Sequence, residues 1–384
     1  MIAKRLRAIE PFLAVEVAER GMELERQGVD IIHLGFGEPD FDTPAVIREA
    51  AARALKDGRT RYVSSLGILP LREAIAEHYH TRYGVTVAAD QIMVTAGTSP
   101  AMMLIFAALL EAGDEVVLTD PHYACYPNFV RFAEGRPVYV PLPEANGFAV
   151  DAEAVRARLT PRTRAILINS PANPTGSVLD AAHLRALAGL EPWIVSDEIY
   201  HGLTYEGEER SILEFTDRAF VLNGFSKAYA MTGWRLGYMI VPRPFVRALH
   251  TALQNFFISA NEFVQWAGVA ALREAGEEAR GFRRIFDERR RAMVAGLRRL
   301  GLGVGVPPRG AFYVLASARH LSADSRRFAF EILDGAHVGV TPGIDFGAAA
   351  EGYLRFSYTN SLARMEEAFG RLERFLAVRG GALA

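Results

Sequence analysis

The sequence of 384 residues contains a single cysteine, Cys125, which excludes an intrachain disulfide, a zinc site built on several thiolates and a CxxC redox pair. An excess of one charge is also missing, because 43 Lys and Arg stand against 45 Asp and Glu, for a net charge of -2. No global field would draw the chain to nucleic acid or to an anionic membrane. These absences favour small-molecule chemistry in a reducing compartment, and we expect a cytoplasmic location.

Long hydrophobic runs are missing as well. The longest apolar run covers residues 101–110 and falls short of the roughly 20 residues that a membrane-spanning helix requires. Acidic residues follow the basic start of the chain where a secretory signal would need an apolar segment, so we expect no export signal. No further His, Cys or acidic residue completes a metal-binding set with His78 and His80, and we predict no metal.

What the sequence does contain is an alternation of strands and helices. Between about residues 45 and 275, apolar β-rich runs that end in turn residues alternate with helical patterns, which is typical of a sheet with helices on both faces. We expect six strands here, at 92–95, 115–119, 165–169, 193–197, 220–223 and 237–241.

The pattern changes after residue 276. An Arg-rich helical stretch is followed by two expected strands, at 311–315 and 353–358, and by a closing amphipathic helix at 362–378. Because the chain exceeds what one core usually serves, we predict an α/β fold with two domains. Residues 45–275 would form the large domain, and residues 1–44 with 276–384 a smaller α+β domain.

Polar and ionisable residues gather just past the expected strands. Open α/β sheets bind ligands outside the carboxyl ends of their strands. Six positions that are far apart in the sequence are therefore expected to meet at one site: Thr98, Tyr123, Asn173, Asp197, Tyr200 and Lys227.

Lys227 lies in a Gly- and Ser-flanked bend between two apolar segments. Burial near a cation such as Arg235 would lower its pKa and make its amine nucleophilic, as Schiff-base chemistry requires. This segment resembles the cofactor-attachment signature of the class I/II aminotransferases, which are fold-type-I pyridoxal-phosphate enzymes, and the resemblance runs nearly end to end. The matching positions are Gly224, Ser226, Lys227, Arg235, Leu236 and Gly237, and blocks beginning at Asn173, Asp197 and Tyr353 follow in the family's order.

The resemblance implies a mostly parallel seven-stranded sheet and pyridoxal 5'-phosphate attached to Lys227. Asp197 would pair with the pyridine nitrogen, Asn173 and Tyr200 would hydrogen-bond the phenolic oxygen, and Tyr123 would stack on the ring. Together with Lys227, the residues implied for catalysis are Asp197 and Tyr200.

The cofactor's phosphate would lie at the start of a helix expected at 100–110, where free backbone N–H groups and the helix dipole favour an anion. Its implied contacts are Gly97, Thr98, Ser99, Ser226 and Arg235. An ordinary helix start with Pro100 as the first helical residue explains the same residue types. Gly224 departs from the many members that have a serine there, so one hydroxyl contact is missing.

The resemblance also implies how a substrate is bound. Arg355 matches the arginine that binds the α-carboxylate of an amino acid, with Gly37 and Asn173 beside it. Tyr62 matches a tyrosine that reaches the phosphate of the neighbouring subunit, which implies a homodimer. The expected reaction moves an amino group from an L-amino acid to a 2-oxo acid by a ping-pong mechanism, with Lys227 carrying the proton from Cα.

We expect a neutral or aromatic donor. A lysine of one bacterial aspartate-specific group is replaced by Ser99, and residues 251–262, where other members place an arginine for the neighbouring subunit, contain neither Arg nor Lys. Aspartate stays an alternative, because Arg61 could serve. A β-lyase or a cyclopropane-forming synthase on the same fold stays another, since fold and cofactor do not determine the reaction. A sensor fused to a DNA-binding domain is disfavoured, because no helix-turn-helix segment or basic arm precedes residue 40.

Overall fold

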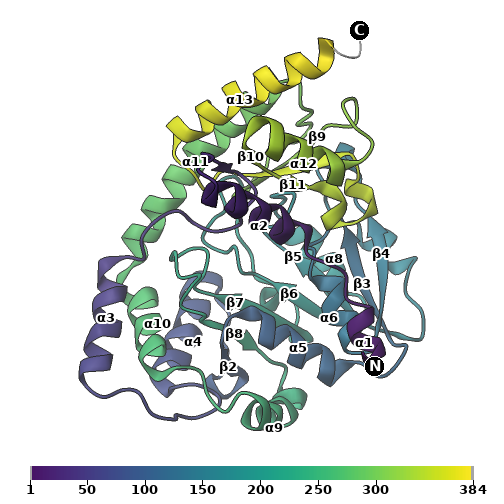
Figure 1. Cartoon of the computed structure of the whole chain (residues 1–384). Helices are drawn as coiled ribbons and strands as arrows, with labels where there is room; N and C mark the ends of the chain where they lie inside the picture. The colour runs from purple at the N-terminus through teal and green to yellow at the C-terminus, as the bar shows by residue number, and fades with distance from the viewer. Residues whose placement is uncertain (1, 382–384) are drawn as a thin grey trace.

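The computed structural model describes residues 2–381, and its centre is a seven-stranded sheet in the order β2-β8-β7-β6-β5-β3-β4 (Figure 1). Only β8 is antiparallel to its neighbours, β2 and β7. The predicted mostly parallel seven-stranded sheet is therefore confirmed. The strands are β2 (Ile92–Thr95), β3 (Glu115–Asp120), β4 (Arg136–Pro141), β5 (Thr163–Asn169), β6 (Trp193–Asp197), β7 (Ala219–Gly224) and β8 (Gly237–Ile240).

Strand β4 was not among the strands expected from the sequence. Pro137 and Pro141 flank its short Val-Tyr-Val segment, and proline cannot donate a ladder hydrogen bond. In the structure β4 is an edge strand paired only with β3, a position in which prolines are tolerated.

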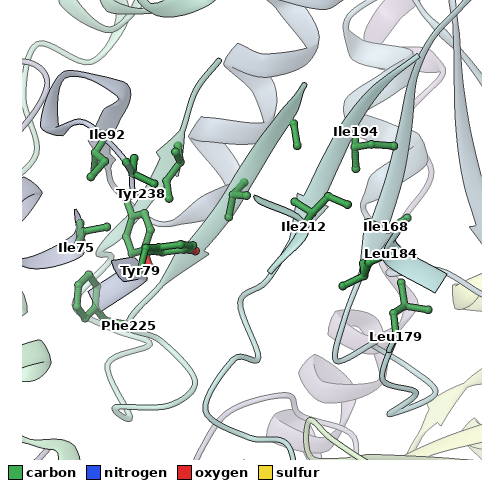
Figure 2. Packing of buried hydrophobic residues seen from close by; sticks show 14 of the residues in the cluster. Ile75, Tyr79, Ile92, Ile168, Leu179, Leu184, Ile194, Ile212, Phe225 and Tyr238 are labelled. Carbon is green, nitrogen blue, oxygen red and sulfur yellow. The ribbon is translucent and has the colours of Figure 1, made fainter. Parts of the chain in front are cut away.

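Successive residues of the central strands face opposite helix layers. Figure 2 shows one face, where the strand residues Ile92, Ile168, Ile194 and Tyr238 share a buried cluster with Tyr79 of a covering helix. Their strand neighbours Met93, Leu167 and Val195 are buried on the other face, so both faces are apolar and the strands read as continuous hydrophobic runs. The first face is covered by α3 (Ala45–Lys56), α4 (Leu69–Tyr83), α8 (Ala181–Ala188) and α10 (Glu262–Glu274), and the second by α5 (Thr98–Leu109), α6 (Tyr126–Phe132) and α9 (Val246–Phe256).

Helix α5 begins earlier than expected. Its first residue is Thr98 and its N-cap is Gly97, so Pro100 lies within the first turn instead of opening the helix. Gly97 has a φ of 87°, a conformation that glycine adopts at little steric cost. The chain can therefore turn sharply directly after β2, and Pro100 is tolerated because first-turn N–H groups have no partner within the helix.

A second hydrophobic core lies above the carboxyl edge of the large sheet (Figure 1). It contains an antiparallel sheet β11-β12-β9 and a short parallel pair of β1 and β10. Strand β1 of the N-terminal segment is thus paired with β10 from the C-terminal region. The elements are β1 (Ile32–His33), β9 (Tyr313–Ser317), β10 (Val338–Gly339), β11 (Thr341–Pro342), β12 (Tyr353–Ser357), α2 (Leu13–Arg26), α11 (Gly276–Arg299), α12 (Ser325–Ala336) and α13 (Leu362–Gly381), with α1 (Lys4–Arg7) and α7 (Ala152–Arg156) elsewhere.

The predicted domain boundaries coincide with the first residues of two helices, Ala45 of α3 and Gly276 of α11. The division into domains itself stays a prediction, and residues 382–384 of the predicted small domain lie outside the described part of the chain. Across that described part, none of the helices combines the length and the apolar character that a membrane crossing requires.

Candidate active site

A cavity of about 310 Å³ opens at the carboxyl edge of the large sheet. The segments that follow β2, β3, β5, β6 and β7 all contribute to its walls. It brings together the six positions expected to meet, and also Gly37, Ser99, Ser226, Arg235 and Arg355. Two predicted site residues are not in its lining. Gly97 lies behind it, against the guanidinium of Arg235, and Tyr62 is 82% exposed on the surface.

Arg235 reaches the cavity because of the single reversed strand. The other contributing strands of the sheet end at this edge, whereas the antiparallel β8 begins there, at Gly237. Arg235 lies two residues before the start of β8, and its Nη1 donates to the carbonyl oxygen of Thr232 at 2.9 Å. A positive side chain is thereby held beside the first turn of α5.

Lys227 lies inside the cavity, where its Nζ donates a hydrogen bond of 2.6 Å to the carbonyl oxygen of Gly37. Burial lowers the pKa of Lys227 to about 8. The nearby cations Arg355 and Arg235 lower it further, while the carboxylates of Glu38 and Asp197 act in the opposite direction. About a tenth of this amine is therefore neutral, and nucleophilic, at pH 7.

Asp197 ends β6 and is 5% exposed. Burial raises the pKa of its carboxyl to about 6, and hydrogen bonds from the Tyr126 hydroxyl at 2.8 Å and the Ile199 N–H at 3.2 Å oppose that shift. A cationic ring nitrogen placed beside this carboxylate would stabilise its ionised form further. The site is thus suited to hold a protonated nitrogen heterocycle.

Arg355 of β12 is 2% exposed and joins three distant segments. Its Nη1 donates to Asn173 Oδ1 at 2.8 Å, and its Nη2 donates to the carbonyl oxygen of Gly35 at 2.6 Å. Its guanidinium lies over the ring of Tyr313, 4.3 Å from the centroid. Its Nε is buried and finds no hydrogen-bond partner among the residues that the structure describes. Such a donor is costly to leave unsatisfied, which indicates a ligand with an acceptor oxygen at this end of the cavity.

The distribution of these groups fits pyridoxal phosphate. Thr98, Ser99, Ser226 and Arg235 supply hydroxyls, a helix start and a positive charge at one end, as a phosphate requires. Asp197 provides a carboxylate for a ring nitrogen, and Lys227 provides an amine for an aldehyde. A side chain at position 97 would overlap the guanidinium of Arg235, so this position at the phosphate end of the cavity requires glycine.

Substituting Gly97 by alanine is expected to weaken pyridoxal phosphate binding about tenfold, because Arg235 must move and the positive φ becomes strained. An absorbance titration of the apoprotein measures this. Gly58→Ala is the matched control, since Gly58 also has a positive φ but a Cβ there would meet no atom within 4 Å. Equal affinities for the Gly97→Ala and Gly58→Ala proteins would contradict the assignment.

Several cavity residues were not predicted from the sequence. Tyr126 donates to Asp197, Tyr313 pairs with Tyr200 through hydroxyls 2.8 Å apart, and Asn169 donates to the Asp197 carbonyl oxygen at 2.8 Å. Phe12 and Val15 enter the cavity from the N-terminal segment. A usable signal existed for Asn169 alone, because it is a polar residue at the end of a predicted strand.

A match to the family described as aminotransferase class I and II covers residues 29–372. The (5-formylfuran-3-yl)methyl phosphate transaminase of Methanocaldococcus jannaschii is 39% identical over 380 residues, which cover 98% of this chain and 100% of that protein. The aspartate/prephenate aminotransferase of Thermus thermophilus is 42% identical over 390 residues, which cover 99% of each. A solved structure of Thermus thermophilus aspartate aminotransferase with maleate has a TM-score of 0.94 and 41% identity, covering 98% of this chain and 99% of that one.

These similarities extend through both cores of the chain and are not confined to one motif. They confirm the family resemblance noted around Lys227, the fold-type-I architecture and the expected cofactor, because class I and II aminotransferases depend on pyridoxal phosphate. The chain belongs to the class I and II aminotransferases and is a pyridoxal-phosphate-dependent transaminase.

Proposed function

We propose that this aminotransferase takes its amino group from a neutral or aromatic L-amino acid, with Lys227 as the catalytic residue that holds the cofactor and moves the proton. One observation carries the proposal. A single cavity contains the amine of Lys227 with its lowered pKa, the buried carboxylate of Asp197, and Arg355 with its unsatisfied Nε donor. The second substrate is a 2-oxo acid, and ping-pong kinetics are expected.

Each residue has a separate task in this mechanism. Bound pyridoxal phosphate supplies an electron-poor ring that takes up the electron pair of the breaking Cα–H bond. Asp197 holds the ring nitrogen in its protonated form, and Arg355 holds the α-carboxylate so that the Cα–H bond is oriented. The amine of Lys227 removes the proton from Cα as a general base and, once protonated, gives the proton back as a general acid.

The chemistry of the cavity walls supports the donor class. Its cationic lining residues are Lys227, Arg235 and Arg355, and each already has a task with the cofactor or the α-carboxylate. The remaining walls include the apolar side chains of Phe12, Val15, Phe36 and Ile199. An apolar donor side chain would gain from burial there, whereas a second carboxylate would be desolvated without a partner.

Aspartate is the second candidate donor. Arg61 adjoins Tyr62 on an exposed segment, and a neighbouring subunit could present both residues to this cavity. The name of the Thermus thermophilus relative, an aspartate/prephenate aminotransferase, favours this alternative. A β-lyase is a third candidate, because the same residues could serve elimination.

We propose that the active unit is a homodimer. Tyr62, Phe256, Phe257 and Ile258 all have exposed side chains, and Tyr62 and Phe256 are 82% and 74% exposed. Phe257 and Ile258 lie beside Ala96 and Pro100, which flank the predicted phosphate contacts. A second copy that covers this surface would bring its Tyr62 towards the phosphate end. Light scattering of the purified protein tests the proposal, and a monomer at micromolar concentration would contradict it.

Attachment of pyridoxal phosphate to the apoprotein should accelerate about tenfold per pH unit up to about pH 8 and then level off, because only the neutral amine of Lys227 attacks the aldehyde. The lowered pKa places the neutral form above pH 8, so the rate is lost as the pH falls. Stopped-flow absorbance measures the profile. A rate that kept rising through pH 10 would indicate a lysine with an ordinary pKa.

The proposed function is tested by adding single amino acids to the holoprotein and recording its visible spectrum and products. Phenylalanine and leucine should convert the cofactor to its amine form, and a 2-oxo acid should reverse the change. Conversion by aspartate alone would establish the second candidate. Formation of pyruvate and ammonia without an amino acceptor would establish a lyase, and failure of every amino acid to react would refute the proposal.

A further inference from the structure

The first turn of α2 is capped by a side chain from the other end of the sequence. Phe12, at the N-cap position, has no polar side-chain atom with which to bind the orphan N–H groups of a helix start. Instead the N–H of Leu13 donates to Asp345 Oδ1 at 2.9 Å, and the N–H of Ala14 donates to Asp345 Oδ2 at 3.0 Å. A carboxylate at this place also complements the helix dipole.

The capped turn is part of the active-site wall. Phe12, Ala14 and Val15 all line the cavity that contains Lys227. The ring of Phe12 meets that of Tyr123 edge to face, with centroids 5.9 Å apart. A change in the position of this turn therefore changes the shape of the cavity.

Asp345 belongs to a short 3-10 helix, Gly343–Phe346, which is not itself in the cavity lining but packs against Arg355, which is. The ring of its next residue, Phe346, lies under the guanidinium of Arg355, with the centroid at 4.7 Å. The same turn thus supports both the arginine with the unsatisfied donor and the start of α2. Burial raises the pKa of Asp345 to about 6, and the two N–H donors oppose this shift.

We propose that Asp345 is a positioning residue for the reaction: by capping α2 it holds Phe12 and Val15 against the cavity, where they contact the side chain of the amino-acid donor. This inference rests on the proposed function, because it assigns the α2 wall to the donor of that reaction. Loss of the cap should therefore weaken the binding of the amino-acid substrate more than it lowers the turnover of the bound amino acid.

Other contacts hold the rest of α2 in place, so loss of the cap should not prevent the protein from folding. Val17 is 3% exposed and packs with Ile31 and Leu333. Arg20 pairs with Asp334 at 3.3 Å, and Glu16 pairs with Arg326 at 3.1 Å. Removing the cap should therefore loosen the first turn while the remaining turns stay in place.

The experiment compares Asp345→Ala, Asp345→Asn and Asp180→Ala with the wild-type holoenzyme. Asp180 is the matched control, because it also accepts two N–H groups at a helix start, from Ala182 and His183, but the turn that it caps is not in the active-site lining. Hydrogen exchange of residues 13–15 and steady-state kinetics with the amino-acid donor are measured on each protein.

Asp345→Ala should accelerate exchange at residues 13–15 and raise the donor KM about fivefold, the size expected for a lost cap, with kcat changed less than about twofold. Asp345→Asn keeps one acceptor oxygen and should recover part of both effects. Asp180→Ala should change neither. An unchanged donor KM in Asp345→Ala, or an equal rise in Asp180→Ala, would overturn the inference. If wild-type enzyme transaminates no amino acid, the proposed function fails instead, and unchanged exchange in Asp345→Ala would still refute the capping role.

Discussion

Replacing Lys227 by alanine is expected to lower turnover by about 10⁴-fold or more, because the protein loses both the amine that attaches the cofactor and the base that moves the Cα proton. The visible absorbance of the attached cofactor should disappear at the same time. Single-turnover formation of the 2-oxo acid with saturating donor measures the first effect, and a spectrum of the dialysed protein measures the second.

The controls are the other lysines of the chain. The sequence contains only Lys4, Lys56 and Lys227, although it has 43 basic residues. Lys4 and Lys56 are exposed, so Lys4→Ala and Lys56→Ala should keep wild-type turnover and cofactor absorbance. Turnover within tenfold of wild type in Lys227→Ala, or a loss in either control, would contradict the assignment.

Substituting Arg355 by lysine should lower kcat/KM for the amino-acid donor about 10²- to 10³-fold, although the charge is kept. Lysine cannot reproduce the planar fork with which the guanidinium binds Asn173 and Gly35 while Nε stays available. It also cannot stack in the same way between Tyr313 and Phe346. Steady-state kinetics over a range of donor concentrations measure the loss.

Arg290→Lys is the matched control for that experiment. Arg290 is also buried, at 5% exposure, and donates to the carbonyl oxygen of Pro308 at 2.8 Å, but it lies outside the cavity lining. This variant should lose thermal stability and keep kcat/KM. A similar fall in kcat/KM in both variants would mean that Arg355 acts through stability and not through the substrate.

The fold was largely predictable because both faces of the central sheet are buried. Strands such as β5 and β6 are then uninterrupted apolar runs followed by turn residues, a pattern that sequence periodicity detects well. Strand β4 was not detected, because an edge position permits prolines that would exclude a central strand. The early start of α5 depended on the backbone conformation of Gly97, which residue identity alone does not determine.

The site was predictable where family motifs or strand ends mark it. Eleven of the predicted residues reach the cavity, and these are Gly37, Thr98, Ser99, Tyr123, Asn173, Asp197, Tyr200, Ser226, Lys227, Arg235 and Arg355. Tyr126, Tyr313 and Asp345 were not found, since their roles arise from contacts between distant segments that no local pattern records.

The contacts of Arg355 also determine when, during synthesis, the protein can first bind an amino acid. Its hydrogen bonds reach Asn173 and Gly35, which are 182 and 320 positions earlier in the chain. Contacts of such separation form only after long loops have closed, so they come late in folding. A growing polypeptide on the ribosome can complete the large sheet before β12 has been synthesised. The capacity to recognise an amino acid therefore arises only after β12 has been made, later than the phosphate-binding end of the cavity.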